Sequence, residues 1–209
     1  MLRRSELAHL VTPHATITID YRTGHTELRP ATSDRPLDGT TVHWVPTGPS
    51  WGTGEIPAAL PTHPPASLSW RLAAIPAVLA TTAALLCHPR RRTFYRLVRL
   101  ATVGRGLPPA TTPQVRSAVR AVRWAAWPLP VRWACLEQST AAALLLAFAG
   151  RRAEWRHGIA LDPIRMHCWI AGPDGRPVDE PEDTSLYTVT RTPDGPGPDF
   201  RDPRGARHE

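Results

Sequence analysis

The apolar residues of the chain form two kinds of segment, most of them between residues 67 and 190. Two uncharged runs, residues 72–87 and 141–149, have the length and the Ala/Leu-rich composition of helices. Shorter stretches with Val, Ile, Thr and Trp predict strands; these are residues 155–161, 165–171 and 185–190. Together they predict an α+β fold in which helices pack on a small antiparallel sheet.

The first apolar run resembles a membrane span, because the positive charges Arg90–Arg92 follow it closely. It is shorter than the roughly 20 apolar residues that a span needs, and Pro76 interrupts it. We therefore expect residues 67–100 to form a pair of helices packed against the core and no transmembrane span. A peripheral contact with a bilayer surface stays open as an alternative.

The N-terminal third has a different pattern. Residues 16–21 and 25–28 predict a short hairpin, and residues 41–45 predict a further strand. A stretch rich in Pro and Gly follows and has the composition of a linker. The predicted organisation is a β-rich segment (1–45), a Pro-rich linker (46–66), a compact domain (67–190) and a disordered tail (191–209).

The charge is distributed unevenly along the 209 residues. All 25 basic residues are Arg, the net charge is +7, and residues 71–134 hold eleven arginines and no Asp or Glu. Such a basic stretch favours an anionic partner. Nucleic acid is disfavoured because stacking aromatics and reading motifs are missing among these arginines. An acidic peptide fits better, and a solvated arginine-covered helix face is the alternative without function.

Three cysteines, with no signal-like apolar run at the start of the chain, favour a reducing cytoplasm and free thiols. Their spacing matches no zinc site. Cys87 and Cys168 are expected to be buried packing residues. His88 and His157 lack a matched acidic residue and are expected at the surface.

Cys135 has the context of a reactive nucleophile. It lies within residues 133–140, which lead into the second apolar run. That run stops at Gly150, a common helix C-terminal residue, and Pro128 and Pro130 lie just upstream of Cys135. We expect Cys135 in the first turn of this helix. Unpaired backbone N–H groups and the helix dipole at that position lower a thiol pKa toward the thiolate.

His167 and Asp179 have the spacing of a base and its orienting carboxylate. The strand 165–171 leads into the turn residues 172–175, which predicts a hairpin. A hairpin centred on Pro173 places positions 167 and 179 opposite each other, on one face. A carboxylate there can hold the imidazole in the tautomer that a cysteine base needs.

Neighbouring candidates have other expected places. Glu180 is expected on the opposite face of the strand, and Asp174 belongs to the turn. Trp169 is expected to be a packing residue that shapes the His167 strand.

Three strings in this region resemble the leader peptidase of lasso peptide biosynthesis, within the transglutaminase-like, papain-related superfamily. They are Cys135-Leu-Glu-Gln-Ser139, His167-Cys-Trp-Ile170 and the turn that ends at Asp179. The resemblance covers roughly residues 70–190. Its one departure is Cys168, where the family more often has Ala or Ser.

The resemblance implies a Cys135–His167–Asp179 peptidase that removes a leader from a ribosomally made precursor. The backbone N–H of Cys135, helped by Gln138, would hold the oxyanion. No metal or other cofactor is implied. The implied partners are the precursor's leader peptide, a leader-recognition protein and an ATP-dependent, asparagine-synthetase-like cyclase.

Other interpretations stay open. The triad chemistry also fits acyl transfer to an amine, as in true transglutaminases, and a non-catalytic leader-binding scaffold would use the Arg-rich segment. Fused relatives carry an N-terminal leader-recognition module that begins with a hairpin similar to the one spanning Asp20 and Gly24. Residues 1–45 are therefore either a partial form of that module or a small β extension.

Overall fold

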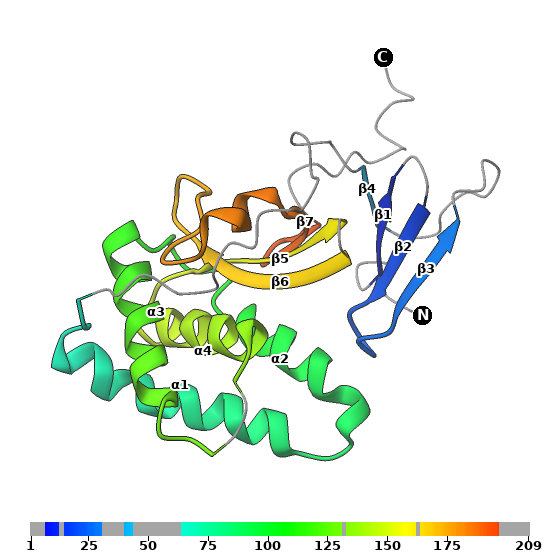
Figure 1. The fold of residues 1–209 in the computed structure, drawn as a ribbon. Coiled ribbons are helices and arrows are strands. Elements are labelled where there is room, and N and C mark those ends of the chain that lie inside the picture. Colours follow the sequence, from blue (N-terminus) through cyan, green and yellow to red (C-terminus); the bar gives the residue numbers. More distant parts are fainter. Residues whose placement is uncertain are drawn as a thin grey trace.

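The structure, a computed structural model, consists of a layer of helices, a four-stranded sheet that covers one side of it, and a second four-stranded sheet beside them (Figure 1). The structure describes residues 7–12, 15–30, 40–43, 64–130, 133–161 and 164–196. The mixed helix and sheet architecture agrees with the predicted α+β class.

The described residues form four α-helices, and the first three pack around the last. They are α1 (Leu68–Leu86), α2 (Thr93–Ala101), α3 (Thr112–Ala126) and α4 (Cys135–Phe148), with short 3-10 turns at Arg90–Arg92 and Glu182–Leu186. In α4 every residue from 139 to 146 is buried. It contacts the other three helices and also strands β5 and β6, so it is the central helix of the domain. The predicted pair of helices within residues 67–100 is confirmed as α1 and α2.

The C-terminal sheet is antiparallel and has the order β6-β5-β7-β8. Its strands are β5 (Glu154–Leu161), β6 (Ile164–Ala171), β7 (Thr188–Thr192) and β8 (Gly195–Pro196). The two long predicted strands are confirmed, whereas the third begins three residues later than expected because a 3-10 turn precedes it. The predicted tail starts too early, because residues 191–196 belong to β7, β8 and their turn; residues 197–209 lie outside the described part.

The N-terminal sheet has the order β3-β2-β1-β4, with β1 and β4 parallel and the other pairs antiparallel. Its strands are β1 (Leu7–Val11), β2 (Ala15–Asp20), β3 (Thr26–Pro30) and β4 (Thr40–His43). The predicted hairpin is confirmed as β2 and β3. Its turn is held by the Asp20 carboxylate, which accepts the backbone N–H of Arg22 at 2.8 Å. Most of the predicted linker, residues 46–63, lies outside the described part.

Tyr21 anchors this sheet to the rest of the fold. Its side chain is buried, and its hydroxyl lies 2.6 Å from His157 Nδ1 and 2.9 Å from Thr190 Oγ1. The guanidinium of Arg191 covers its ring at 4.6 Å. His157 was expected at the surface, and that prediction is wrong: it points inward from β5, and burial lowers the pKa of its imidazole to about 4. A neutral His157 is therefore the partner of Tyr21 at neutral pH.

We expect Tyr21→Phe to lower the free energy of unfolding by about 1–3 kcal/mol, because His157 and Thr190 lose a buried hydrogen-bond partner. Urea denaturation measures the change. Tyr95→Phe is the matched control, because the Tyr95 hydroxyl receives only a 3.5 Å contact from Arg99 at the surface. Equal effects of the two substitutions would contradict the anchoring role of Tyr21.

Candidate active site

Cys135 is the first residue of α4, as predicted. The helix begins there because the Glu137 carboxylate accepts the backbone N–H of Ala134 at 3.0 Å, and the N–H of Gln138 donates to the Ala134 carbonyl at 3.1 Å. The N–H of Cys135 precedes this first helical hydrogen bond. It is therefore free to receive a developing negative charge.

Ser139 fixes this end of α4 to the sheet. Its Oγ accepts the indole N–H of Trp155 at 3.0 Å and donates to the Leu136 carbonyl at 3.2 Å. Both Ser139 and Trp155 are buried. The serine four residues after Cys135 thus has a positioning role, which the sequence pattern alone does not identify.

His167 lies on β6, the edge strand that faces the start of α4. Its imidazole stacks on Trp169, with 5.8 Å between the ring centroids and 15° between the ring planes. The centroid of the Tyr187 ring lies 5.4 Å from that of His167. Gly158, opposite His167 on β5, makes room for this stack, because a Cβ at position 158 would approach the Trp169 ring to 2.7 Å. The expected packing role of Trp169 is confirmed.

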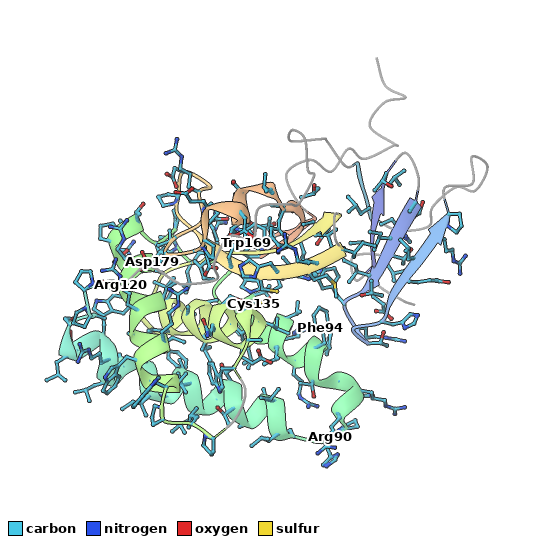
Figure 2. All side chains as sticks on the ribbon, in the orientation of Figure 1. Arg90, Phe94, Arg120, Cys135, Trp169 and Asp179 are labelled. Carbon is cyan, nitrogen blue, oxygen red and sulfur yellow. The ribbon has the colours of Figure 1, made fainter. Side chains whose placement is uncertain are left out.

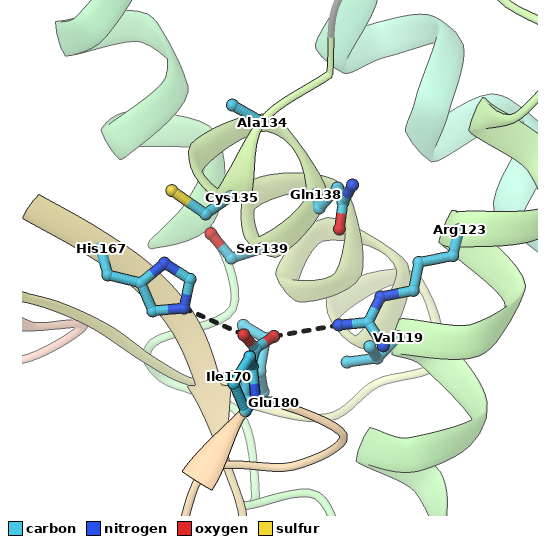
Figure 3. A pocket seen from close by; sticks show the side chains of 10 residues that line it. Val119, Arg123, Ala134, Cys135, Gln138, Ser139, His167, Ile170 and Glu180 are labelled. Carbon is cyan, nitrogen blue, oxygen red and sulfur yellow. Dashed lines mark hydrogen bonds and ion pairs between the residues drawn. The ribbon is translucent and has the colours of Figure 1, made fainter. Parts of the chain in front are cut away.

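Glu180 supplies the carboxylate beside His167. Its Oε2 lies 2.9 Å from His167 Nε2, and its Oε1 receives a hydrogen bond from Arg123 at 3.1 Å (Figure 3). The Glu180 side chain is only 12 % exposed. The expectation that Glu180 lies on the opposite face of the strand is wrong.

Asp179 is not opposite His167, because the hairpin is shifted by one residue from its predicted centre. Ala171 pairs with Pro177, so the centre is Asp174 and the loop has three residues, with Gly175 at φ 79°. Moving the centre by one residue moves the position opposite His167 by two, from 179 to 181, so this shift does not by itself exchange the faces of the strand. Asp179 itself has φ 54°, a left-handed conformation that ends the strand and brings Glu180 to His167.

Asp179 instead contacts α3. Its carboxylate receives hydrogen bonds from Arg120 at 2.6 and 3.3 Å and lies 3.5 Å from Arg116 (Figure 2). With Arg123 on Glu180, three arginines at helical spacing hold the two neighbouring carboxylates. Part of the arginine excess therefore has internal acidic partners. This pairing was not predicted, although the separations of four and three residues between Arg116, Arg120 and Arg123 place these arginines on one helix face.

The electrostatics favour an ion pair between Cys135 and His167, whose side chains point toward each other (Figure 3). Hydrogen bonds from the Cys168 thiol and then from His167 outweigh burial and lower the pKa of the Cys135 thiol to about 4. Burial alone would lower the pKa of His167, but hydrogen bonds to Cys135 and Glu180 outweigh it and raise the pKa to about 9. Between these values the pair is a thiolate and an imidazolium.

The other two cysteines depart from expectation. Cys168 is buried, as predicted, but besides packing in the core its thiol is the largest influence that lowers the pKa of Cys135. Burial, together with the interaction with Cys135, raises the pKa of Cys168 well above its usual value, so it remains a neutral thiol. Cys87 was expected to be buried and is exposed, because it lies just beyond the end of α1.

A cavity of about 160 Å³ opens onto the reactive groups (Figure 3). Cys135, His167, Glu180 and Gln138 are among the residues that line it. It can admit a carbonyl group to the thiol, with the Cys135 N–H available for an oxyanion. In the described ranges no three His, Cys, Asp or Glu side chains gather in a way that could hold a metal ion.

The sequence model of the Transglutaminase-like superfamily matches residues 78–192, which is more than half of the chain. No curated protein and no solved structure matches the chain. The matched range contains α4, the strands β5 to β7 and every residue of the cavity. The chain therefore belongs to the transglutaminase-like superfamily.

Proposed function

We propose that the protein is a cysteine peptidase that removes the leader from a lasso peptide precursor. Cys135 is the nucleophile, His167 the acid–base residue and Glu180 the orienting carboxylate. The observation that carries the proposal is a helix-terminal thiol that points toward a histidine whose Nε2 is bound by a largely buried carboxylate (Figure 3). The superfamily includes peptidases and acyltransferases, and both use this chemistry.

The mechanism follows from the ion pair. The Cys135 thiolate attacks a peptide carbonyl, and the oxyanion is held by the Cys135 N–H and, in this proposal, by Gln138. The C–N bond breaks as the His167 imidazolium gives its proton to the departing amine. His167, now neutral, takes a proton from water, whose oxygen attacks the thioester and releases the acid and the thiolate.

The narrower substrate class rests on the resemblance of the strings around Cys135, His167 and Asp179 to lasso peptide leader peptidases. Cleavage frees the N-terminus of the core peptide, which an ATP-dependent, asparagine-synthetase-like cyclase then joins to an acidic side chain. A leader-recognition protein, or the N-terminal sheet anchored by Tyr21, presents the leader. We propose a cytoplasmic location for these steps.

We expect the protein to cut its precursor at a single peptide bond and Cys135→Ala to lose at least about 1,000-fold in rate, because the nucleophile is gone. Intact mass spectrometry follows the precursor with the cyclase and a leader-binding partner present. Cys87→Ala is the matched control and should cleave normally.

Cleavage by Cys135→Ala would contradict the peptidase assignment. Incorporation of a labelled amine without leader release would identify an acyltransferase. A bound but intact precursor with the wild-type protein would favour a scaffold.

The two neighbouring carboxylates should differ in effect. We expect Glu180→Gln to lower kcat/KM by about 100-fold or more, because the imidazolium loses the carboxylate that orients and stabilises it. Asp179→Asn should act mainly on stability, by weakening the contact with Arg120. Urea denaturation and cleavage kinetics of both variants separate these effects. If Asp179→Asn had the larger effect on kcat/KM at unchanged stability, Asp179 would be the orienting residue.

The pH dependence of thiol alkylation tests the ion pair. In a Cys87→Ser background, we expect the rate of Cys135 alkylation by iodoacetamide to be nearly constant from about pH 5 to pH 8, because the thiolate is already formed. The His167→Ala variant should instead show a rate that rises up to about tenfold per pH unit as its higher thiol pKa is approached. Identical profiles would contradict the stabilisation of the thiolate by His167.

A further inference from the structure

The outward face of α1 is apolar from Leu72 to the end of the helix, and Ser69 is the one exposed polar residue of α1. Only four of its residues are buried: Ala74, Ala77, Val78 and Thr81. On the exposed side five large side chains repeat at helical spacing, namely Leu68 (66 % exposed), Leu72 (54 %), Ile75 (40 %), Leu79 (56 %) and Leu86 (62 %). A helix that is apolar on both faces is normally enclosed, so this exposed stripe indicates a binding surface.

Positive charge lies at one end of this stripe. The 3-10 turn Arg90–Arg92 follows α1, and all three of its side chains are exposed. None of the three forms an ion pair with a described carboxylate, in contrast to the three α3 arginines at the active site. No Asp or Glu occurs between residues 71 and 134, so the surface offers no negative charge of its own.

An exposed tryptophan, Trp124, lies at the other end. The guanidinium of Arg71, in the first turns of α1, covers the ring of Trp124 at 5.4 Å. Trp124 is 45 % exposed, and Trp127, just after α3, is 88 % exposed. Arginine and tryptophan beside an apolar helix face are the residues enriched where proteins contact the boundary between lipid headgroups and acyl chains.

We propose that this face, defined as the exposed stripe of α1 with Arg90–Arg92 and Trp124, binds the surface of an anionic lipid bilayer. The helix would lie in the interface and would not span it, because its other face is buried in the fold against α3 and α4. The leucines enter the acyl boundary, and the arginines bind lipid phosphates. This proposal does not depend on the chemistry of Cys135.

Charge favours a bilayer over a second copy of the chain. Two α1 helices packed together would bring two basic surfaces close to each other, with no carboxylate from residues 71–134 to neutralise them. The exposed positions from residue 72 to 86 also carry no polar side chain, and the ordered polar contacts that give a protein interface its specificity are therefore missing. Binding to an anionic bilayer requires neither carboxylates from the protein nor ordered polar contacts along the helix.

The position of the face suits such a contact. Figure 1 places α1 on the side of α4 that is away from the sheet β5–β8, and Figure 2 places Arg90 at the outer edge of that side. Glu180 and Asp179 follow β6 on the sheet side. Binding through α1 therefore leaves the carboxylates of the active site away from the anionic surface.

Co-sedimentation with lipid vesicles tests the proposal. The full chain is mixed with vesicles of phosphatidylcholine, with and without phosphatidylglycerol, at low and high salt. We expect binding only where phosphatidylglycerol is present, and weaker binding at high salt. The triple substitution R90Q/R91Q/R92Q should lower the partition coefficient about 100-fold, and L72S/L79S should lower it about tenfold or more. Leu28→Ser, an equally exposed position on β3, should bind as the wild type does.

Circular dichroism and the alkylation rate of Cys135 check that each variant is folded. We expect folded variants because Leu72 and Leu79 are at the surface. Failure of the wild-type protein to bind either kind of vesicle would overturn the proposal. So would binding that neither set of substitutions reduces. A stable dimer in sedimentation velocity that L72S/L79S dissociates would assign the face to a second copy and would also overturn it.

Discussion

The burial of α4 between the other helices and the edge of the C-terminal sheet is the constraint on which the site depends. Residues 139–146 are enclosed, and Ser139 binds the indole of Trp155, so the helix cannot slide or turn along β5 and β6. Its N-terminus is thereby fixed at strand β6, which carries His167. The reactive thiol gains its low pKa from this placement, because Cys168 and His167 both reach it from that strand.

The second constraint is electrostatic. A thiolate and an imidazolium hold each other, and Glu180 holds the imidazolium from the other side. Glu180 and Asp179 are two adjacent carboxylates with little exposure, and their mutual repulsion is offset by the arginines of α3. The arginine excess therefore serves two surfaces: α3 neutralises the active-site loop, while Arg90–Arg92 face outward beside an apolar helix.

Local patterns predicted the helices and strands well, but they predicted poorly which residues face each other across the hairpin that follows β6. The apolar run before Gly150 identified α4 and put Cys135 in its first turn, and β-rich composition identified β5 and β6. The shift from Asp179 to Glu180 depends on the backbone of a single residue, because Asp179 itself takes a left-handed conformation (φ 54°) that ends the strand just before Glu180. The burial of His157 depends on Tyr21, 136 residues away, which no local pattern contains.

The protonation of His167 tests the central claim, a stable ion pair with Cys135, most directly. Nuclear magnetic resonance of protein with isotope-labelled histidine reports the charge and tautomer of the ring as pH is varied. We expect an imidazolium that persists through neutral pH and titrates near pH 9, with a lower pKa in Cys135→Ala. A neutral His167 at pH 7, titrating near the ordinary value of about 6.5 in both proteins, would contradict the ion pair.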